Sequence, residues 1–253
     1  QELGNYGYAF SNVNPIPDVD KNNLTVGFNY FIEPGKKGYV RRISFIGNER
    51  TQDKVLRREM RQFESSYYDQ EKIDMSSRRL KRTQYFEGVD IKTVSVPGIS
   101  DQVDLTVAVK EKNTGSVKLG AGASSDEGLV GSFSVTQANF LGTGNSVSAT
   151  INTSSVNTIY QLSHVDPYFT PDGISRRLTG YMKETNTKDL DTGQYDKKSY
   201  GLGVGFGIPM NEFDTVRIGF DADMSDITLV DSSPQRYKDY CKDVSGGSNG
   251  CCY

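Results

Sequence analysis

Few side chains in this sequence have the types and spacing that catalysis requires. The only histidine, His164, stands two positions before Asp166, so the two could form an acid–base pair. No nucleophile or metal-binding motif accompanies them, which argues against enzymatic use. Asp221 and Asp223 could bind a cation, but carboxylates at alternate strand positions are also usual in a wet barrel lumen. We therefore predict no catalytic residue, no metal site and no cofactor.

The last thirteen residues contain all three cysteines, Cys241, Cys251 and Cys252. None of them has the paired spacing of a zinc site. A disulfide in a surface loop is an open interpretation, in which Cys241 pairs with either of the other two. The adjacent Cys251 and Cys252 are more typical of a loop than of a redox site.

Composition and charge exclude several classes of protein. The net charge is −3 with no basic stripe, which argues against nucleic acid as a partner. With 24% charged and 35% hydrophobic residues the chain resembles a folded protein with a core. No apolar run reaches the roughly 18 residues of a transmembrane helix. The first residues lack the basic flank and apolar core of a signal peptide, so we expect the chain to start after removed residues.

Residues 39–112 mix strand and helix patterns. Alternation at 41–45 predicts a strand that ends at Gly47. Thr51 is a suitable N-cap for a first helix. Its apolar stripe consists of Val55, Leu56, Met60 and Phe63. Its charged residues, which lie mainly off that stripe, are Arg57, Arg58, Arg61 and Glu64.

A second helix is predicted from Asp69 to about Arg82, with Ile73 and Leu80 facing inward. A strand beginning near Val89 and a clean alternation over 103–109 follow it, with a turn at Pro97-Gly98 between them. The predicted order of elements is therefore β-α-α-β-β.

After Asn113 the helical period disappears and seven segments of period two follow. They run roughly over 115–124, 129–137, 145–153, 158–166, 174–184, 200–208 and 216–224. Each has about the length of a tilted membrane strand, with one apolar and one polar face. Seven strands cannot close a bacterial barrel of even strand number, so we expect the N-terminal part of an antiparallel transmembrane β-barrel, truncated partway round.

The links between these segments differ in chemistry. Those after the second, fourth and sixth segments are compact and rich in aromatic residues, whereas those after the third, fifth and seventh are polar. Outer-membrane barrels have short periplasmic turns and longer outer loops, so we predict that the compact links are periplasmic. One rim would then carry Phe140, Tyr168, Phe169 and Phe213 at interfacial depth.

Several motifs in fixed order carry a resemblance to a known family. Those in the mixed part are 55–62, 85–89, 96–98 and 101–104, and those in the strand-rich part are 111–116, 139–144 and 166–170. The first set resembles the last POTRA domain, and the second the first strands and periplasmic turns, of the POTRA-plus-β-barrel outer-membrane assembly and transport superfamily. The resemblance covers 39–240, and 241–253 match no motif of it.

The resemblance implies three parts. Residues 1–37 are similar to the C-terminal part of a preceding POTRA domain, 38–113 to an α+β POTRA domain, and 114–253 to an incomplete barrel of about seven strands. It also implies a bacterial outer-membrane location with POTRA domains in the periplasm, and a function in assembling and inserting β-barrel proteins. The alternative is a two-partner-secretion transporter that moves a client through its lumen. A passive porin is disfavoured, because porins lack such periplasmic modules.

The resemblance further implies partners and sites. Partners would be accessory outer-membrane lipoproteins, unfolded barrel clients and the lipid bilayer. Lipoprotein docking would use Arg57, Arg58, Arg61 and Glu64, since Glu64 matches a family position implicated in that binding. Client strands would be templated on the first barrel strand, because the family is proposed to have a weak seam there. The templating residues would be Gly115, Ser116, Val117, Lys118, Leu119, Gly120, Ala121 and Gly122.

Overall fold

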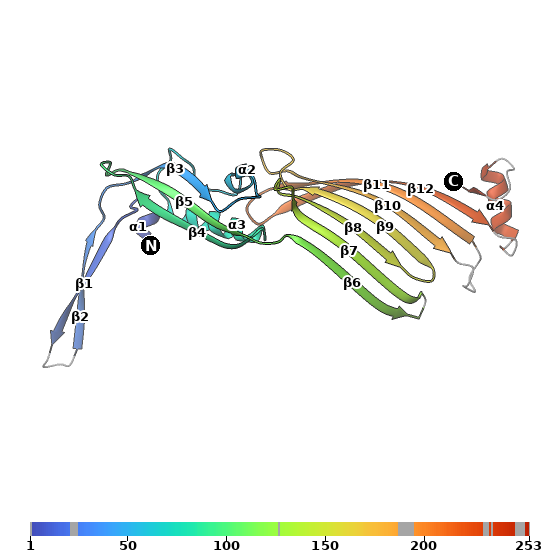
Figure 1. The fold of residues 1–253 in the computed structure, drawn as a ribbon, viewed down its shortest axis with the longest axis horizontal. Helices are drawn as coiled ribbons and strands as arrows, with labels where there is room; N and C mark the ends of the chain where they lie inside the picture. The colour runs from blue at the N-terminus through green and yellow to red at the C-terminus, as the bar shows by residue number, and fades with distance from the viewer. Residues whose placement is uncertain are drawn as a thin grey trace. The chain divides into compact units, whose positions relative to one another are not determined.

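The computed structural model describes residues 2–20, 25–125, 127–186, 195–229, 233, 235–245 and 251–252. It divides into two compact units, Gln1–Asn113 and Thr114–Tyr253, whose elements Figure 1 labels. The first unit starts with a short helix, α1 (Glu2–Asn5), and an antiparallel hairpin of β1 (Asn12–Asp20) and β2 (Thr25–Glu33). Every residue of β2 is exposed, so this hairpin has no core of its own.

A three-stranded sheet with two helices forms the rest of the first unit. The elements are β3 (Tyr39–Ile46), α2 (Asp53–Arg57), α3 (Gln70–Arg82), β4 (Phe86–Ser95) and β5 (Gln102–Glu111). The sheet order is β3-β5-β4, with β3 parallel and β4 antiparallel to the central β5. The predicted β-α-α-β-β order is confirmed.

The core of this unit lies between the sheet and its helices. Alternate residues of β5 are buried, with Leu105 and Val107 fully inaccessible. They share one cluster with Leu56 of α2 and Leu80 of α3. Helix α3 begins where predicted, because the side chain of Asp69 accepts hydrogen bonds from the first backbone N–H groups of the helix.

The first helix is shorter than predicted. It ends at Arg57 instead of continuing past Phe63, and its N-cap is Gln52, which makes no capping hydrogen bond from its side chain. Thr51 is instead buried and donates its backbone N–H to Glu111 at 2.7 Å. Phe63 leaves the apolar stripe and is 64% exposed. The segment after α2 has a helical sequence pattern, but hydrogen bonds of the buried side chain of Gln62 hold it in a turn instead.

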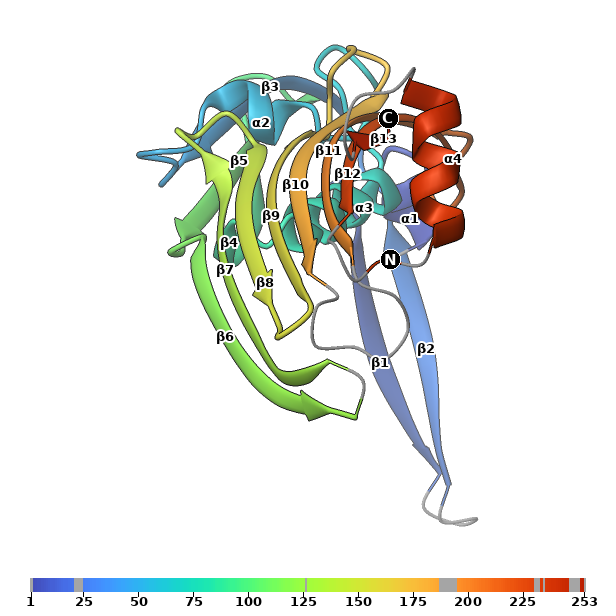
Figure 2. The ribbon, with the colours of Figure 1, turned by 90° about the vertical axis from the view of Figure 1, so that its right-hand side faces the viewer.

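The second unit is an eight-stranded antiparallel sheet in the order β13-β12-β11-β10-β9-β8-β7-β6. Its strands are β6 (Gly115–Ser124), β7 (Gly128–Phe140), β8 (Asn145–Thr153), β9 (Asn157–Asp166), β10 (Ser175–Asn186), β11 (Tyr195–Pro209), β12 (Thr215–Leu229) and β13 (Cys251–Cys252). In the sequence, helix α4 (Gln235–Ser245) comes between β12 and β13. Figure 2 shows the sheet as a curved, open wall. The seven predicted strands are confirmed, with ends that differ from the prediction by up to five residues, and the sheet does not close.

No helix in the described part of the chain is both long and apolar enough to cross a membrane.

The register of the sheet separates an apolar face from a polar face. Cross-strand partners such as Leu178 and Val204, or Val204 and Phe220, lie on the apolar face. On the polar face, a Cβ added to Gly201 would lie 2.2 Å from the ring of Tyr181. The glycines of β11 therefore make room for side chains of the neighbouring strands.

The lengths of the links do not follow the prediction. The link after β8 has three residues (154–156), whereas the aromatic link after β9 has eight (167–174). The link after β10 lies outside the described residues. Tight hairpins need only a few residues at either rim, so length does not separate the two sets here. Aromatic content does separate the two sets of links, because Phe140, Phe169 and Phe213 are exposed at one end of the sheet. The assignment of that end to the periplasm stays a prediction.

Candidate functional sites

Two of the four predicted docking residues meet at the outer edge of β3. Arg57 and Glu64 form an ion pair of 3.4 Å. Glu64 Oε1 also accepts the backbone N–H of Ile43 at 2.8 Å, and Arg57 donates to the carbonyl of Ile43 at 3.4 Å. The Arg57 guanidinium lies 5.1 Å from the centre of the Phe45 ring. The pair thus forms hydrogen bonds with the backbone N–H and carbonyl groups of the β3 edge, and both charged side chains remain exposed to solvent.

The other two arginines are placed differently. The Arg58 side chain is only 16% exposed and lies 4.0 Å from Glu59, which in turn pairs with Arg79 at 2.8 Å. Arg58 therefore belongs to a largely buried ionic group between α2 and α3, and the expectation of a solvent-facing Arg58 is wrong. Arg61 is half-buried, and its backbone N–H donates to Ser76 Oγ at 2.8 Å.

Gln62 organises the segment 58–69 and was missed in the sequence. Its side chain is fully buried, accepts from the N–H of Asp69 at 3.0 Å and donates to the carbonyl of Tyr67 at 2.9 Å. These hydrogen bonds turn the chain towards solvent at Phe63 and Ser65, and Ser65 has a φ of +63°. The ring of Tyr67 stacks on Tyr39 with 4.4 Å between centroids. The surface therefore combines a charged pair with exposed aromatic side chains.

Glu111 ties the end of β5 to the loop before α2. Its carboxylate accepts the N–H groups of Thr51 at 2.7 Å and Arg50 at 3.1 Å. Burial alone would raise the pKa of Glu111, but the hydrogen bonds from Thr51 and Arg50 outweigh it and lower that pKa below its ordinary value. The charged form of this carboxylate thus stabilises the unit.

The predicted templating strand, β6, is at the end of the sheet and pairs with β7 alone among the described strands. All ten of its residues, including the eight predicted templating residues, are exposed. A Cβ on Gly120 would lie 2.4 Å from Ser132 Oγ, whereas a Cβ on Gly122 would meet nothing within 4 Å. A larger residue in place of the first glycine would thus displace the hydroxyl of Ser132 in β7, and the second glycine leaves the strand surface bare.

The structure does not bring together the remaining candidates for chemistry. His164 Nε2 lies 3.4 Å from Asn145, while Asp166 accepts the N–H of Tyr168 at 3.1 Å. Asp223 accepts a hydrogen bond from the hydroxyl of Tyr181 on the polar face of the sheet. The side chains of Cys241, Cys251 and Cys252 lie outside the described parts, so their disulfide stays a prediction.

The fold and these sites define a POTRA domain joined to part of an outer-membrane barrel, and known proteins share both. Residues 38–112 match the POTRA family, described as a surface antigen variable number repeat. Residues 139–249 match the Omp85 superfamily domain, so the similarity extends beyond residue 240, where the motifs ended. The chain belongs to the Omp85 superfamily.

Within that superfamily the chain is similar to BamA. It is 37% identical to the outer membrane protein assembly factor BamA of Neisseria meningitidis serogroup B, over 95% of this chain and 30% of that protein. The BamA of Buchnera aphidicola is 31% identical over 86% of this chain and 35% of its own length. The chain thus spans about a third of these curated relatives.

A solved structure supports the same relationship. The crystal structure of BamA from Haemophilus ducreyi lacking POTRA domains 1–3 superposes with a TM-score of 0.85 and 31% identity, over 98% of this chain and 47% of that one. CdiB from Acinetobacter baumannii, with a TM-score of 0.56 and 15% identity, shares the fold alone. Strands β6–β12 accordingly lie in the bacterial outer membrane, and residues 38–112 in the periplasm.

Proposed function

We propose that the protein containing this chain assembles and inserts β-barrel proteins into the outer membrane. The observation that carries the proposal is the similarity to BamA, which extends over nearly the whole chain in both sequence and structure. Assembly requires binding and templating rather than bond-making, which agrees with the prediction that the protein is not an enzyme.

Client strands need hydrogen-bond partners because the bilayer core supplies none. Each unpaired backbone group in hydrocarbon costs several kcal/mol, so a strand that enters alone is strongly disfavoured. A strand edge that offers N–H and carbonyl groups removes this cost by β-augmentation, in which backbone bonds provide the affinity. We assign this role to the edge of β6 at residues 115–122, whose outward side pairs with no described strand of the sheet.

Site-specific crosslinking tests the templating edge. A photoreactive residue at Lys118 in β6 should crosslink to a stalled client in the full-length protein. Ser148 in β8 is a matched control, because β8 is paired on both sides and should give no product. Equal yields at the two positions, or no product at Lys118, would remove the assignment.

We also propose that an accessory lipoprotein docks on the surface formed by Arg57, Arg61, Phe63 and Glu64. This set omits Arg58, which is held in the interior ionic group, and adds Phe63, an exposed aromatic side chain of the kind that anchors interfaces. Charge reversal by Glu64→Lys should weaken binding by roughly 2–5 kcal/mol, because it leaves a desolvated partner charge unpaired.

Copurification of the lipoprotein with the full-length protein tests this surface. Glu64 also holds the N–H of Ile43, so Glu64→Gln serves as a control that keeps an acceptor there and removes only the charge. Glu49→Lys makes the same charge change at another exposed position. Copurification should fall with Glu64→Lys, fall less with Glu64→Gln and stay unchanged with Glu49→Lys. Equal copurification of all three variants would exclude this docking surface.

The alternative of a client-conducting transporter rests on fold alone, through the CdiB structures at 14–15% identity. Liposomes that contain the full-length protein separate the two functions. Faster folding of an unfolded outer-membrane barrel supports assembly, and further acceleration by lipoproteins supports docking. Passage of a soluble client into the liposomes without faster barrel folding supports the transporter.

A further inference from the structure

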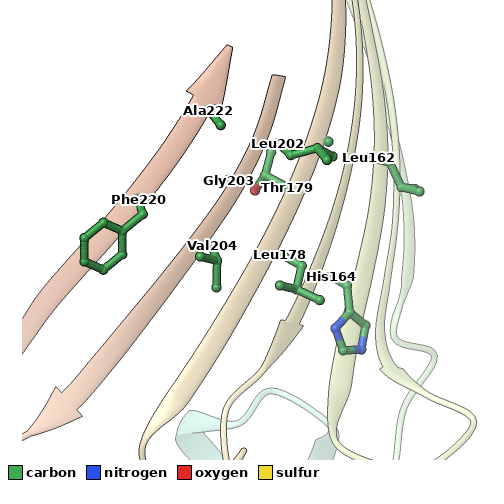
Figure 3. A pocket seen from close by; sticks show the side chains of 10 residues that line it. Leu162, His164, Leu178, Thr179, Leu202, Gly203, Val204, Phe220 and Ala222 are labelled. Atoms are coloured by element: carbon green, nitrogen blue, oxygen red, sulfur yellow. The ribbon is translucent and has the colours of Figure 1, made fainter. Parts of the chain in front are cut away.

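The apolar face of the barrel sheet contains a hollow of about 580 Å³ over β9 to β12. Gly180 of β10 forms part of its floor, between its cross-strand partners Leu162 and Leu202. Because glycine has no side chain, the floor is open at Gly180, where an added Cβ would lie 3.4 Å from Cδ2 of Leu202. Figure 3 shows the neighbouring side chains, with Phe220 on one flank and His164 on the other. The hollow is therefore an apolar depression on the face that contacts lipid.

Arg176 lies on the same strand and the same face, four residues before Gly180. At a rise of about 3.3 Å per residue, roughly 13 Å separate the two Cα atoms. Its guanidinium lies 4.1 Å from the centre of the Phe169 ring, and that ring is 6.3 Å from Phe206. The Nε atom of Arg176 is buried and has no hydrogen-bond partner among the described residues.

Arg176 makes no ion pair with Asp166, the residue opposite it in the sheet register. Asp166 is its cross-strand partner, but the Asp166 carboxylate accepts the backbone N–H of Tyr168 at 3.1 Å. Among the described residues, no ion pair joins Arg176 to any carboxylate. The next polar groups on this face are His164 and Asn145, which contact each other. An arginine on the lipid-facing side is costly in hydrocarbon and tolerated at headgroup depth, where phosphates are available.

We propose that this face binds one anionic phospholipid, with its phosphate at Arg176 and an acyl chain in the hollow over Gly180. The aromatic rim sets the headgroup depth, because Phe169 is both an exposed rim residue and the ring that holds the guanidinium. From that depth the direction from Arg176 to Gly180 leads into the membrane, as an acyl chain does. The site requires only that the sheet lies in a bilayer, so it is independent of the assembly function.

Native mass spectrometry of the full-length protein from nanodiscs of phosphatidylglycerol and phosphatidylcholine in equal amounts tests the site. The wild-type protein should retain a phosphatidylglycerol molecule preferentially. Arg176→Gln should lower that retention roughly tenfold, the size expected for a lost charge-assisted hydrogen bond. Arg177→Gln is the matched control, because Arg177 is the adjacent residue on the polar face and should leave retention unchanged.

A second variant tests the acyl-chain half of the site. Gly180→Leu fills the hollow without touching the charge, so it should also lower retention of phosphatidylglycerol. A gel shift on heating verifies that each variant has a folded barrel. The proposal is overturned by equal loss in the Arg176 and Arg177 variants, by wild-type protein that retains both lipids equally, or by unchanged retention in Gly180→Leu.

Discussion

The periplasmic domain and the barrel sheet of this chain are stabilised in different ways. Every buried hydrophobic residue in the described part of the chain lies between Val40 and Val109, in the POTRA domain. In the described part of the barrel unit the buried residues are serines and glycines, and large apolar side chains such as Leu202 and Phe220 are mostly exposed. The domain therefore supplies its own apolar interior, while the sheet depends on lipid outside and on close packing across its polar face.

Core truncation should show the largest difference between the two regions. Leu105 is fully buried, and Leu105→Ala should lower the free energy of unfolding of the POTRA domain by about 2–5 kcal/mol, because it leaves a cavity. Leu202→Ala in the sheet should cost only about 1–2 kcal/mol, since lipid fills the space and the transfer term alone is lost. Urea unfolding of each part in the full-length protein measures both, and equal costs would contradict the comparison.

A smaller effect should come from the glycines of the sheet. Gly201→Ala places a methyl group 2.2 Å from the Tyr181 ring, so we expect about 1–3 kcal/mol of destabilisation of the barrel. Gly122→Ala meets nothing within 4 Å and is the matched control, with an effect close to zero. The urea midpoint of the heat-dependent gel shift reports the difference. A shift of the same size in both variants would show that the glycines serve backbone freedom and not space.

The smallest effect should be a pH dependence that belongs to the POTRA domain. The pKa of Glu111 is lower in the folded domain than in the unfolded chain. Its contribution to stability is therefore complete above the unfolded pKa of about 4.3 and is lost as the pH falls through the folded pKa. Glu111→Gln should lower the urea midpoint of the domain at pH 7, and the gap to the wild type should narrow towards pH 3. A constant gap would indicate that the charge of Glu111 is irrelevant.

The sequence predicted the sheet better than the surface of the domain. The predicted bounds of strands such as 115–124 and 145–153 agree with the structure at both ends. The reason is that the alternation of apolar and polar residues and the register of hairpins both depend on local sequence. The POTRA order also followed from local periods. The length of α2 did not, because the turn of segment 58–69 is set by the buried side chain of Gln62, which bonds to residues up to seven positions away.

The candidate sites show the same limit. Arg57 and Glu64 are solvent-exposed, and their part in docking stays a prediction. The sequence could not show that Arg58 turns inward to Glu59, since that depends on Arg79 of another helix. Nor could periodicity locate the hollow at Gly180, which requires the register of three strands. Contacts between elements distant in sequence decide both features.

The most direct test of the account is the folding rate of an unfolded outer-membrane barrel in liposomes that contain the full-length protein, with a synthetic peptide of the client's terminal strand added in excess. We predict faster folding than in protein-free liposomes. The peptide should abolish this acceleration by occupying the edge of β6, whereas the same peptide with methylated backbone nitrogens should not. Folding no faster than in protein-free liposomes would contradict the assembly function, and acceleration that survives the peptide would contradict templating at β6.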